Sequence, residues 1–354
     1  MTSYTVFLVF TICLGTLFRY SLACSEIIQN VSIEVEDKDG EWSNITLNGC
    51  IQRSNLNGIT VKEIRIRHQN ISKLGKDYVK HLIKLDTLVF EDCQIESIAQ
   101  GALRNLPVIR HVEITHNPIK KITGGIFDVF DTIKVLRLNN NQISYITDEA
   151  LSNMTVTEVN FSHNNFSIWK SVWFAHSPYI EKLDFSFNVI TAVPKRAFDG
   201  MPVLKELNFE HNKISAIGSG AFRKLSSLQV LNLRSNVLTT INVDVFGDRI
   251  SINSMNLASN RFNDIPIDIF GKLKLKEISL SRNPWICPCL NKLYNLLFNK
   301  RVKVVPADNC KLDHLPICIV NDVCGFPQSN RGIVQFYSII DKLQDVDREC
   351  IGYQ

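Results

Sequence analysis

Three stretches of the chain repeat one pattern of apolar residues: IEKLDFSFNVI at residues 180–190, LKELNFEHNKI at 204–214 and LQVLNLRSNVL at 228–238. In each eleven-residue frame, apolar residues hold positions 1, 4, 6 and 11, and asparagine holds position 9. Alternation of this kind is typical of a strand with one buried side. A buried amide that makes no hydrogen bonds costs about 1–3 kcal/mol. The pattern therefore predicts that each asparagine side chain pairs with nearby backbone groups.

The same frame continues in both directions with a period of 24 or 23 residues. Its starts are Val61, Leu85, Ile109, Ile133, Val156, Ile180, Leu204, Leu228, Ile252 and Leu275. A second apolar column follows eighteen residues after the starts, at Leu103, Phe127, Leu151, Phe174, Phe198, Phe222, Phe246 and Phe270. Self-similarity at this period is typical of leucine-rich repeats. We therefore expect an α/β solenoid, a leucine-rich repeat horseshoe whose stacked parallel strands form a concave sheet.

A ladder of asparagines is expected to run through this solenoid. Its members are Asn117, Asn141, Asn164, Asn188, Asn212, Asn236, Asn260 and Asn283. An amide carries both a donor and an acceptor, so each one can pair with its own turn and with the turn of a neighbouring repeat. The first two repeats have Gln69 and Cys93 instead, and end repeats that meet a cap are commonly atypical. We interpret Cys93 as a buried free thiol.

The repeats divide the chain into four segments: a signal peptide at 1–23, an N-terminal cap at 24–60, about ten repeats at 61–285, and a cysteine-rich C-terminal cap with a helix at 286–354. Val6 to Leu17 is an apolar run of twelve residues, too short to span about 30 Å of hydrocarbon. Ser21 and Ala23 are the small residues of a cleavage site. With a net charge of only +4, neither nucleic acid nor a membrane surface is the expected partner. The mature protein is expected to be secreted, without a membrane span.

Six N-x-S/T sequons agree with secretion. They are Asn30, Asn44, Asn70, Asn153, Asn160 and Asn165. Asn160 is the informative one, because its frame position places it on the concave strand face. If Asn160 carries a glycan, partners should use the N-terminal third of that face, the convex loops or the C-terminal cap. If it does not, the whole concave face stays open.

Nine cysteines remain after the signal peptide. Cys24 and Cys50 bracket the N-terminal cap and are expected to form a disulfide. The C-terminal cap contains Cys287, Cys289, Cys310, Cys318, Cys324 and Cys350. Six cysteines allow fifteen pairings, and although a C-x-C pair can bind zinc, a secretory signal favours disulfides. Because nine is odd, either Cys93 stays free or a tail cysteine bonds another chain.

The segment that ends at Cys350 has an apolar spacing of 3-4-3, at Ile333, Phe336, Ile340 and Leu343. This spacing predicts one apolar face of a helix. We expect the helix to pack on the cap, with Cys350 holding its end.

Side chains at positions five and seven of each frame are expected to point from the concave face. Arginine is common among the residues that dominate binding energy. The candidate partner-binding residues are Arg65, Arg67, Glu91, Arg137 and Arg234. Charges alternate in sign along these positions, so there is no basic track for a polyanion.

Position eight holds a row of four histidines, on every second repeat: His68, His116, His163 and His211. Neighbours in this row would lie about 10 Å apart, which is too far to share a metal ion. Although a pH-sensing row is conceivable, we interpret them as variants tolerated at an exposed position. The sequence has no G-x-S-x-G, H-E-x-x-H or phosphate-binding glycine motif. We expect no enzymatic activity and no cofactor.

The C-terminal cap carries a family resemblance. Its opening NPWICPC at 283–289 resembles the cysteine cap of extracellular leucine-rich repeat proteins, and this resemblance implies a disulfide between Cys287 and Cys310. The segments CKLDHLPICIVNDVC at 310–324 and IIDKLQDVDREC at 339–350 resemble those of the mosquito leucine-rich immune proteins. In that family a long coiled coil commonly follows, and disulfide-linked partners hold a complement-like thioester protein. This sequence stops four residues after Cys350, so it resembles the branch without a coil.

The resemblance implies a secreted, glycosylated binding protein of innate immunity. Its partner would be an extracellular protein, with a complement-like thioester protein as one candidate, or a microbial surface. Homo- or hetero-oligomers are compatible with it. Two alternatives stay open: an adhesion or matrix-organising protein would localise to tissue, and an extracellular enzyme regulator would act through the cysteine-rich tail.

Overall fold

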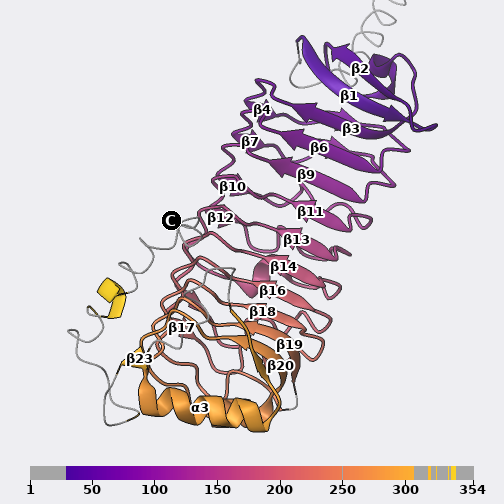
Figure 1. Ribbon diagram of the computed structural model, residues 1–354. Helices are drawn as coiled ribbons and strands as arrows, with labels where there is room; N and C mark the ends of the chain where they lie inside the picture. Colours follow the sequence, from indigo (N-terminus) through magenta and orange to yellow (C-terminus); the bar gives the residue numbers. More distant parts are fainter. Residues whose placement is uncertain are drawn as a thin grey trace, which may run out of the picture.

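The computed structural model describes residues 29–248, 250–306, 318, 319, 324, 334 and 336–339. Its main feature is a stack of short strands that runs along the whole molecule (Figure 1). Thirteen strands form one sheet in the order β2-β1-β3-β6-β9-β11-β13-β14-β16-β18-β19-β20-β22. All neighbours from β3 onward pair in parallel, which confirms the predicted leucine-rich repeat solenoid. We call the solvent-facing side of this sheet the concave face.

The strands of the sheet are short. Their bounds are β1 Val31–Asp37, β2 Trp42–Leu47, β3 Val61–Arg67, β6 Thr87–Glu91, β9 His111–Thr115, β11 Val135–Arg137, β13 Glu158–Asn160, β14 Lys182–Asp184, β16 Glu206–Asn208, β18 Val230–Asn232, β19 Ser251–Asn256, β20 Lys274–Ser279 and β22 Lys303–Val304. Equivalent frame positions lie side by side, as in the pairs Leu183 with Leu207 and Leu207 with Leu231. The repeat period therefore sets the register of the sheet.

Small two-stranded sheets and turns complete each repeat away from the concave face. They pair β4 Lys73–Leu74 with β7 Ser97–Ile98, β5 Val79–Lys80 with β8 Leu103–Arg104, β10 Lys121–Ile122 with β12 Tyr145–Ile146, and β15 Ala192–Val193 with β17 Ala216–Ile217. Within residues 29–306 as described, the helices are the 3-10 turns η1 Arg53–Leu56 and η2 Ser171–Phe174, and the α-helices α2 Asp268–Lys272 and α3 Cys287–Asn299. The described part of the chain thus contains little helix.

A β-hairpin covers the N-terminal end of the solenoid. β1 is antiparallel both to β2 and to β3, and Val31, Ile33 and Val35 bury its inner side. In the turn, the Asp37 carboxylate accepts the N–H groups of residues 39 and 41. Cys50 is disulfide-bonded, whereas the expected partner Cys24 and the predicted signal peptide lie outside the described residues.

The asparagine ladder forms as predicted. Asn212 donates its side-chain N–H groups to the carbonyls of Phe185, Phe209 and Glu210, at 2.9, 3.1 and 3.3 Å, and its Oδ1 accepts from the Ile190 N–H at 3.0 Å. The other members repeat this scheme, except that Asn141 Oδ1 has no partner among the described residues. These amides are therefore part of the scaffold.

Cys93 occupies the ladder position of the second repeat as a buried free thiol, which confirms the prediction. Its Sγ lies 3.2 Å from the Ile66 carbonyl and 3.3 Å from the Glu91 carbonyl, so the S–H replaces the amide donor. Burial raises the pKa of Cys93 to about 11. The thiol is therefore protonated and unreactive at neutral pH.

The core contains more aromatic rings than the predicted column. The residues of the predicted apolar column from Phe127 to Phe270, one per repeat, are buried as expected. Between repeats five and seven, Trp169 and Trp173 add a cluster that the frame did not predict, and Phe185 lies at its centre. The Trp169 indole N–H donates to the Ala197 carbonyl at 3.3 Å. This cluster adds aromatic packing to the middle of the solenoid core.

The C-terminal end is closed by α3, which lies across the last strands (Figure 1). Leu290, Leu293 and Leu297 form its buried side. Phe336 is buried in the short helical stretch 336–339, and the Tyr337 hydroxyl donates to the Asn260 carbonyl at 3.1 Å. That helix therefore contacts a repeat. Its expected residues Ile333, Ile340, Leu343 and Cys350 lie outside the described part.

Among the described residues, two disulfides hold the C-terminal cap, and one corrects the expectation from the family resemblance. Cys287 is bonded to Cys318, so its assignment to Cys310 is wrong. The reason is strand pairing: β21 Trp285–Ile286 lies parallel to β23 Cys318–Ile319, which brings the two Cα atoms to 5.1 Å.

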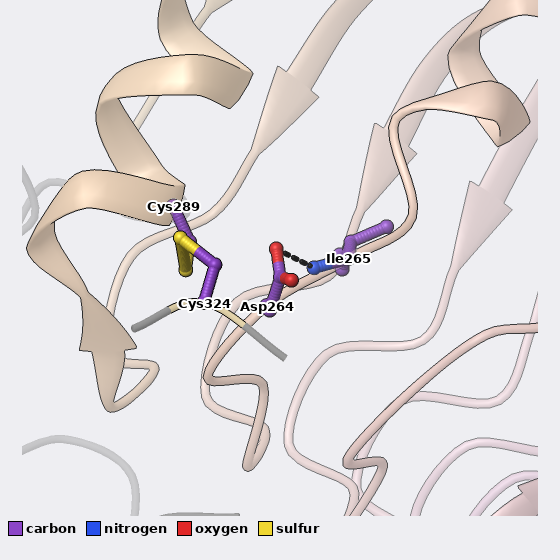
Figure 2. The surroundings of a disulfide bond; sticks show 4 residues. All are labelled: Asp264, Ile265, Cys289 and Cys324. Carbon is purple, nitrogen blue, oxygen red and sulfur yellow. Dashed lines mark hydrogen bonds between the residues drawn. A yellow bond between two sulfur atoms is a disulfide. The ribbon is translucent and has the colours of Figure 1, made fainter. Parts of the chain in front are cut away.

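The second disulfide joins Cys289 to Cys324 and lies beside Asp264, whose carboxylate accepts the Ile265 N–H (Figure 2). Cys310 is outside the described residues. No helix in the described ranges is long and apolar enough to cross a membrane.

Candidate functional site

The concave face has two halves, because strands end at different frame positions. β3, β6 and β9 extend to position seven and end at Arg67, Glu91 and Thr115. Five later strands, β13, β14, β16, β18 and β19, end at an asparagine or aspartate at position five. Each of these side chains accepts the N–H of position seven, for example Asn160 from Ser162 at 2.8 Å and Asp184 from Ser186 at 2.8 Å. In such an Asx turn, the side-chain oxygen accepts the N–H that would otherwise hydrogen-bond to the neighbouring strand if the strand were longer.

This strand ending changes which predicted side chains are exposed. Position seven does not point from the concave face in the middle repeats, where Ser162 and Ser186 are buried. Arg234 is only 6% exposed, so it offers little surface to a partner. The expectation that position seven lines the face holds for Arg67 and Glu91 in the longer strands.

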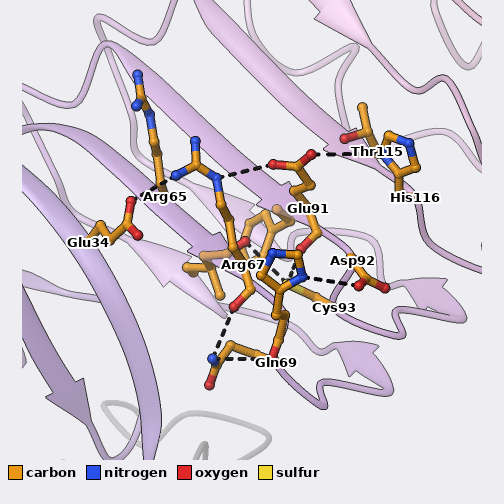
Figure 3. Close-up of polar contacts among 12 residues, drawn as sticks. Glu34, Arg65, Arg67, Gln69, Glu91, Asp92, Cys93, Thr115 and His116 are labelled. Carbon is orange, nitrogen blue, oxygen red and sulfur yellow. Dashed lines mark hydrogen bonds and ion pairs between the residues drawn. The ribbon is translucent and has the colours of Figure 1, made fainter.

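The N-terminal half brings three of the predicted residues together. Arg67 lies between two carboxylates, with Nη1 2.9 Å from Glu34 and Nε 3.1 Å from Glu91 (Figure 3). Arg65 forms an ion pair with Glu63 and lies over the Trp42 ring, with Cζ 4.6 Å from the ring centre. Trp42 is 44% exposed.

We call this cluster of Glu34, Trp42, Arg65, Arg67 and Glu91 the N-terminal concave patch. Its residues come from β1, β2, β3 and β6. The ion pairs hold the long side chains in place, while about a third of each arginine side chain remains exposed. The sequence did not indicate Trp42, because no repeat frame includes β2.

Arg137 forms a separate centre one strand beyond β9. It joins three strands, with Nη1 2.7 Å from Glu113 on β9 and Nη2 2.8 Å from Glu158 on β13. His111 Nε2 lies 2.6 Å from the same Glu113 oxygen. Hydrogen bonds from His111 and Arg137 lower the pKa of Glu113 to about 2, although its burial opposes the shift.

Replacing Glu113 with glutamine tests this centre through pH. The folded-state pKa lies below the ordinary value of 4.5, so Glu113 stabilises the fold fully above that value and loses its contribution as the pH falls towards 2. We expect Glu113→Gln to lower the free energy of unfolding at neutral pH by on the order of 2 kcal/mol. Urea unfolding at several pH values measures the effect. The difference in free energy of unfolding between the variant and the wild type should decrease below pH 4.5. A difference that stays constant would contradict the assignment, and Glu96→Gln is the exposed control.

The C-terminal half contains a shallow hollow of about 320 Å³. Its lining includes Glu158, Asn160, Lys182, Asp184, Glu206, Asn208, Val230 and Asn232. We call it the amide hollow. Of the asparagines in this lining, Asn208 donates from Nδ2 to Asp184 at 3.2 Å, and Asn232 donates from Nδ2 to Glu210, outside the hollow, at 3.0 Å.

Position eight has a backbone requirement that the sequence interpretation missed. All ten residues there adopt a left-handed conformation, with φ between 50 and 56°, a region in which histidine, asparagine and aspartate are enriched. Histidine therefore has a structural reason to occur at this position. Phe187 and Arg282 are bulky exceptions. The Phe187 ring is stacked between His163 and His211 at centroid distances of 4.2 and 4.4 Å. Burial lowers the pKa of His211.

The sequons lie on different surfaces. Asn30, Asn44, Asn70, Asn153 and Asn165 are exposed. Asn160 is half-buried at the end of β13, directly beside Arg137 in the register of the sheet. No cluster of three potential metal-ligating side chains occurs in the ranges that the structure describes.

Two family models match the chain. The model for a BspA type leucine rich repeat region of six copies matches residues 50–181, and the leucine rich repeat model matches residues 154–214 and 202–262. Together they cover residues 50–262 of the 354-residue chain. The chain belongs to the leucine-rich repeat family. A comparison with curated proteins finds no match.

Solved structures of two leucine-rich repeat complexes are similar to this protein. The Toll–Spatzle complex, described as a molecular hub in Drosophila development and innate immunity, aligns over 68% of this chain with 16% identity and a TM-score of 0.57. The complex of the mosquito proteins LRIM1 and APL1C aligns over 83% with 18% identity and a TM-score of 0.53. This leucine-rich repeat chain spans 34% of the first structure and 55% of the second. At these identities the likeness concerns the fold alone.

Proposed function

We propose that this leucine-rich repeat protein is a secreted binding protein of innate immunity, acting in recognition or as a complement-like cofactor. It would engage an extracellular protein partner or a microbial surface through the N-terminal concave patch. One observation carries this proposal: an exposed indole and two arginines are held together on one rigid strand face. Tryptophan and arginine are the residue types most enriched among binding hot spots.

The charge of the patch favours a protein partner. Arg65 and Arg67 alternate with Glu34, Glu63 and Glu91, so neither sign dominates. Mixed charges of this kind give specificity between proteins, whereas a polyanion would require a continuous basic surface. The similar solved structures are themselves complexes, and the family resemblance of the C-terminal cap supports an immune role.

Capture from the extracellular fluid of the host tests the proposal. The full-length protein serves as bait before and after immune challenge, and bound proteins are identified by mass spectrometry under non-reducing conditions. We expect the double variant Arg65→Ala with Arg67→Ala to lose the challenge-dependent partner by at least about tenfold, because hot-spot truncations cost more than 1.4 kcal/mol. These ion pairs are partly exposed on the protein surface, where an ion pair typically contributes little to folding, so the variant should remain folded.

Arg104→Ala is the matched control, since Arg104 also forms an ion pair, with Asp77, but lies outside the concave sheet. Equal capture by the double variant and the wild type would place the site elsewhere. Capture of matrix or cell-surface proteins only, unchanged by challenge, would favour the adhesion alternative.

A further inference from the structure

We propose that Asn160 carries an N-linked glycan whose first sugars lie in the amide hollow, and that this glycan confines partners to the N-terminal side of the concave face. The glycan on Asn160 is independent of the proposed function. The confinement of partners refines the proposed function and rests on it.

The hydrogen bonding of Asn160 leaves its glycosylation atom available. Its Oδ1 accepts the Ser162 N–H at 2.8 Å. Its Nδ2, the atom to which a glycan attaches, makes no hydrogen bond within the described part of the chain. Asn208 and Asn232 hold the same frame position, but their Nδ2 groups donate to carboxylates. Asn256 accepts the Ala258 N–H in the same way, and its Nδ2 is likewise unused in the described residues, but it is followed by Leu257-Ala258 and is not a sequon. Asn160 is therefore the sequon asparagine of this row whose amide nitrogen is unused in the described part of the chain.

The neighbouring strand explains the difference. The residue beside Asn208 on the preceding strand is Asp184, which accepts a hydrogen bond. The residue beside Asn160 on the preceding strand is Arg137, whose side chain has no acceptor. Asp184 lies beside Asn160 on the following strand, but its carboxylate accepts from Ser186 and Asn208. A glycan on Nδ2 would replace one hydrogen of the amide and break none of the hydrogen bonds of the fold. The Asx turn that ends β13 can persist in the glycosylated protein.

The amide hollow suits the first sugars of such a glycan. Asn160 is part of its lining, and the strands that follow add Asp184, Glu206 and Asn208. Carboxylates and amides both hydrogen-bond hydroxyl groups. The volume of about 320 Å³ lies at the lower end of the range for ligand sites in proteins.

A glycan at this position divides the predicted binding residues into two groups. Arg137 lies directly beside Asn160, about 4.8 Å away across the sheet, so an occupied Asn160 would cover it. Arg65 and Arg67 lie four strands away on β3, a distance of about 19 Å. A partner could reach the N-terminal concave patch but not Arg137.

Glycopeptide analysis tests the modification without any partner. The protein is secreted from a eukaryotic host, and enzymatic deglycosylation in heavy water marks each occupied asparagine for mass spectrometry. Ser162→Ala removes the Asn160 sequon but keeps the backbone N–H that Asn160 accepts. Ser167→Ala is the matched control, because it removes the identical Asn-Phe-Ser sequon at Asn165. We expect Asn160 to be occupied in the wild type and in Ser167→Ala. An unmodified Asn160 beside a modified Asn165 would overturn the proposal.

A thiol introduced on the neighbouring strand tests the shielding. Lys182 lies on β14 in the amide hollow with half of its side chain exposed, and Cys93 is buried and will not compete for the reagent. We expect Lys182→Cys to react with a polyethylene glycol maleimide several-fold more slowly in the wild type and Ser167→Ala backgrounds than in Ser162→Ala. Equal rates in all three would refute the shielding. Neither readout depends on the double arginine variant, so the two proposals can fail separately.

Discussion

Replacing Phe185 with alanine is expected to lower the free energy of unfolding by about 4–5 kcal/mol, the upper end of the range for truncating a buried phenylalanine. Its ring is fully buried. Six aromatic rings surround it at centroid distances of 5.2 to 6.4 Å, those of Phe161, Phe166, Trp169, Trp173, Phe174 and Phe209. Large rigid rings on every side cannot collapse into the space, so the cavity should persist.

Urea unfolding followed by tryptophan fluorescence measures this loss, since Trp169 and Trp173 belong to the same cluster. Phe298→Ala is the control, because Phe298 is 83% exposed and should change stability by less than about 0.5 kcal/mol. Phe185→Leu should give an intermediate loss and remains measurable if the alanine variant does not fold. A loss below about 2 kcal/mol for alanine would show that the cluster is loosely packed.

Replacing Asn188 with alanine is expected to cost about 2–4 kcal/mol, less than its four hydrogen bonds suggest. Its Oδ1 accepts the Phe166 N–H at 3.0 Å, and its Nδ2 donates to the carbonyls of Phe161, Phe185 and Ser186. Each of these carbonyls has a second donor, namely Asn164 for Phe161, Asn212 for Phe185 and the His163 N–H for Ser186. Only the Phe166 N–H would be left without a partner in the described structure.

Asn188→Asp separates the acceptor from the donor role. The carboxylate keeps an acceptor for Phe166 but faces three carbonyl oxygens, so at neutral pH it should be more destabilising than alanine. Protonation should recover part of the loss at low pH. Urea unfolding at both pH values measures the effect, with Asn253→Ala as the control, since the Asn253 side chain makes no hydrogen bond in the described ranges. If aspartate were tolerated better than alanine at neutral pH, the donor role of the ladder would be refuted.

The repeat pattern was sufficient to predict the fold, the asparagine ladder and the buried state of Cys93. Each of these features depends on contacts between equivalent positions of adjacent repeats, and a period of 24 or 23 residues specifies those contacts directly. The position-five row was also readable, because asparagine or aspartate recurs at Asn160, Asp184, Asn208, Asn232 and Asn256. That these residues end the strands was not recognised from the sequence. The burial of Arg234, two positions after Asn232, was therefore not predicted.

The candidate site was only partly predictable. Arg65, Arg67 and Glu91 were found from their frame positions, but Trp42 belongs to the hairpin outside the repeats and joins them only through the antiparallel pairing of β1 and β2. The left-handed backbone at position eight could have been inferred from its histidines. The stacking of Phe187 between two of them depends on the distance between adjacent strands.

The sequence by itself determined the solenoid, its core and the amides that join its turns, because a short period repeats the same local contacts. Only the tertiary structure decided the bond between Cys287 and Cys318, the ion pairs of Arg67 and Arg137, and the burial of Arg234. These features depend on which residues of different segments lie side by side. That neighbourhood is set by where each strand ends and by pairing with segments outside the repeats, neither of which the repeat period encodes.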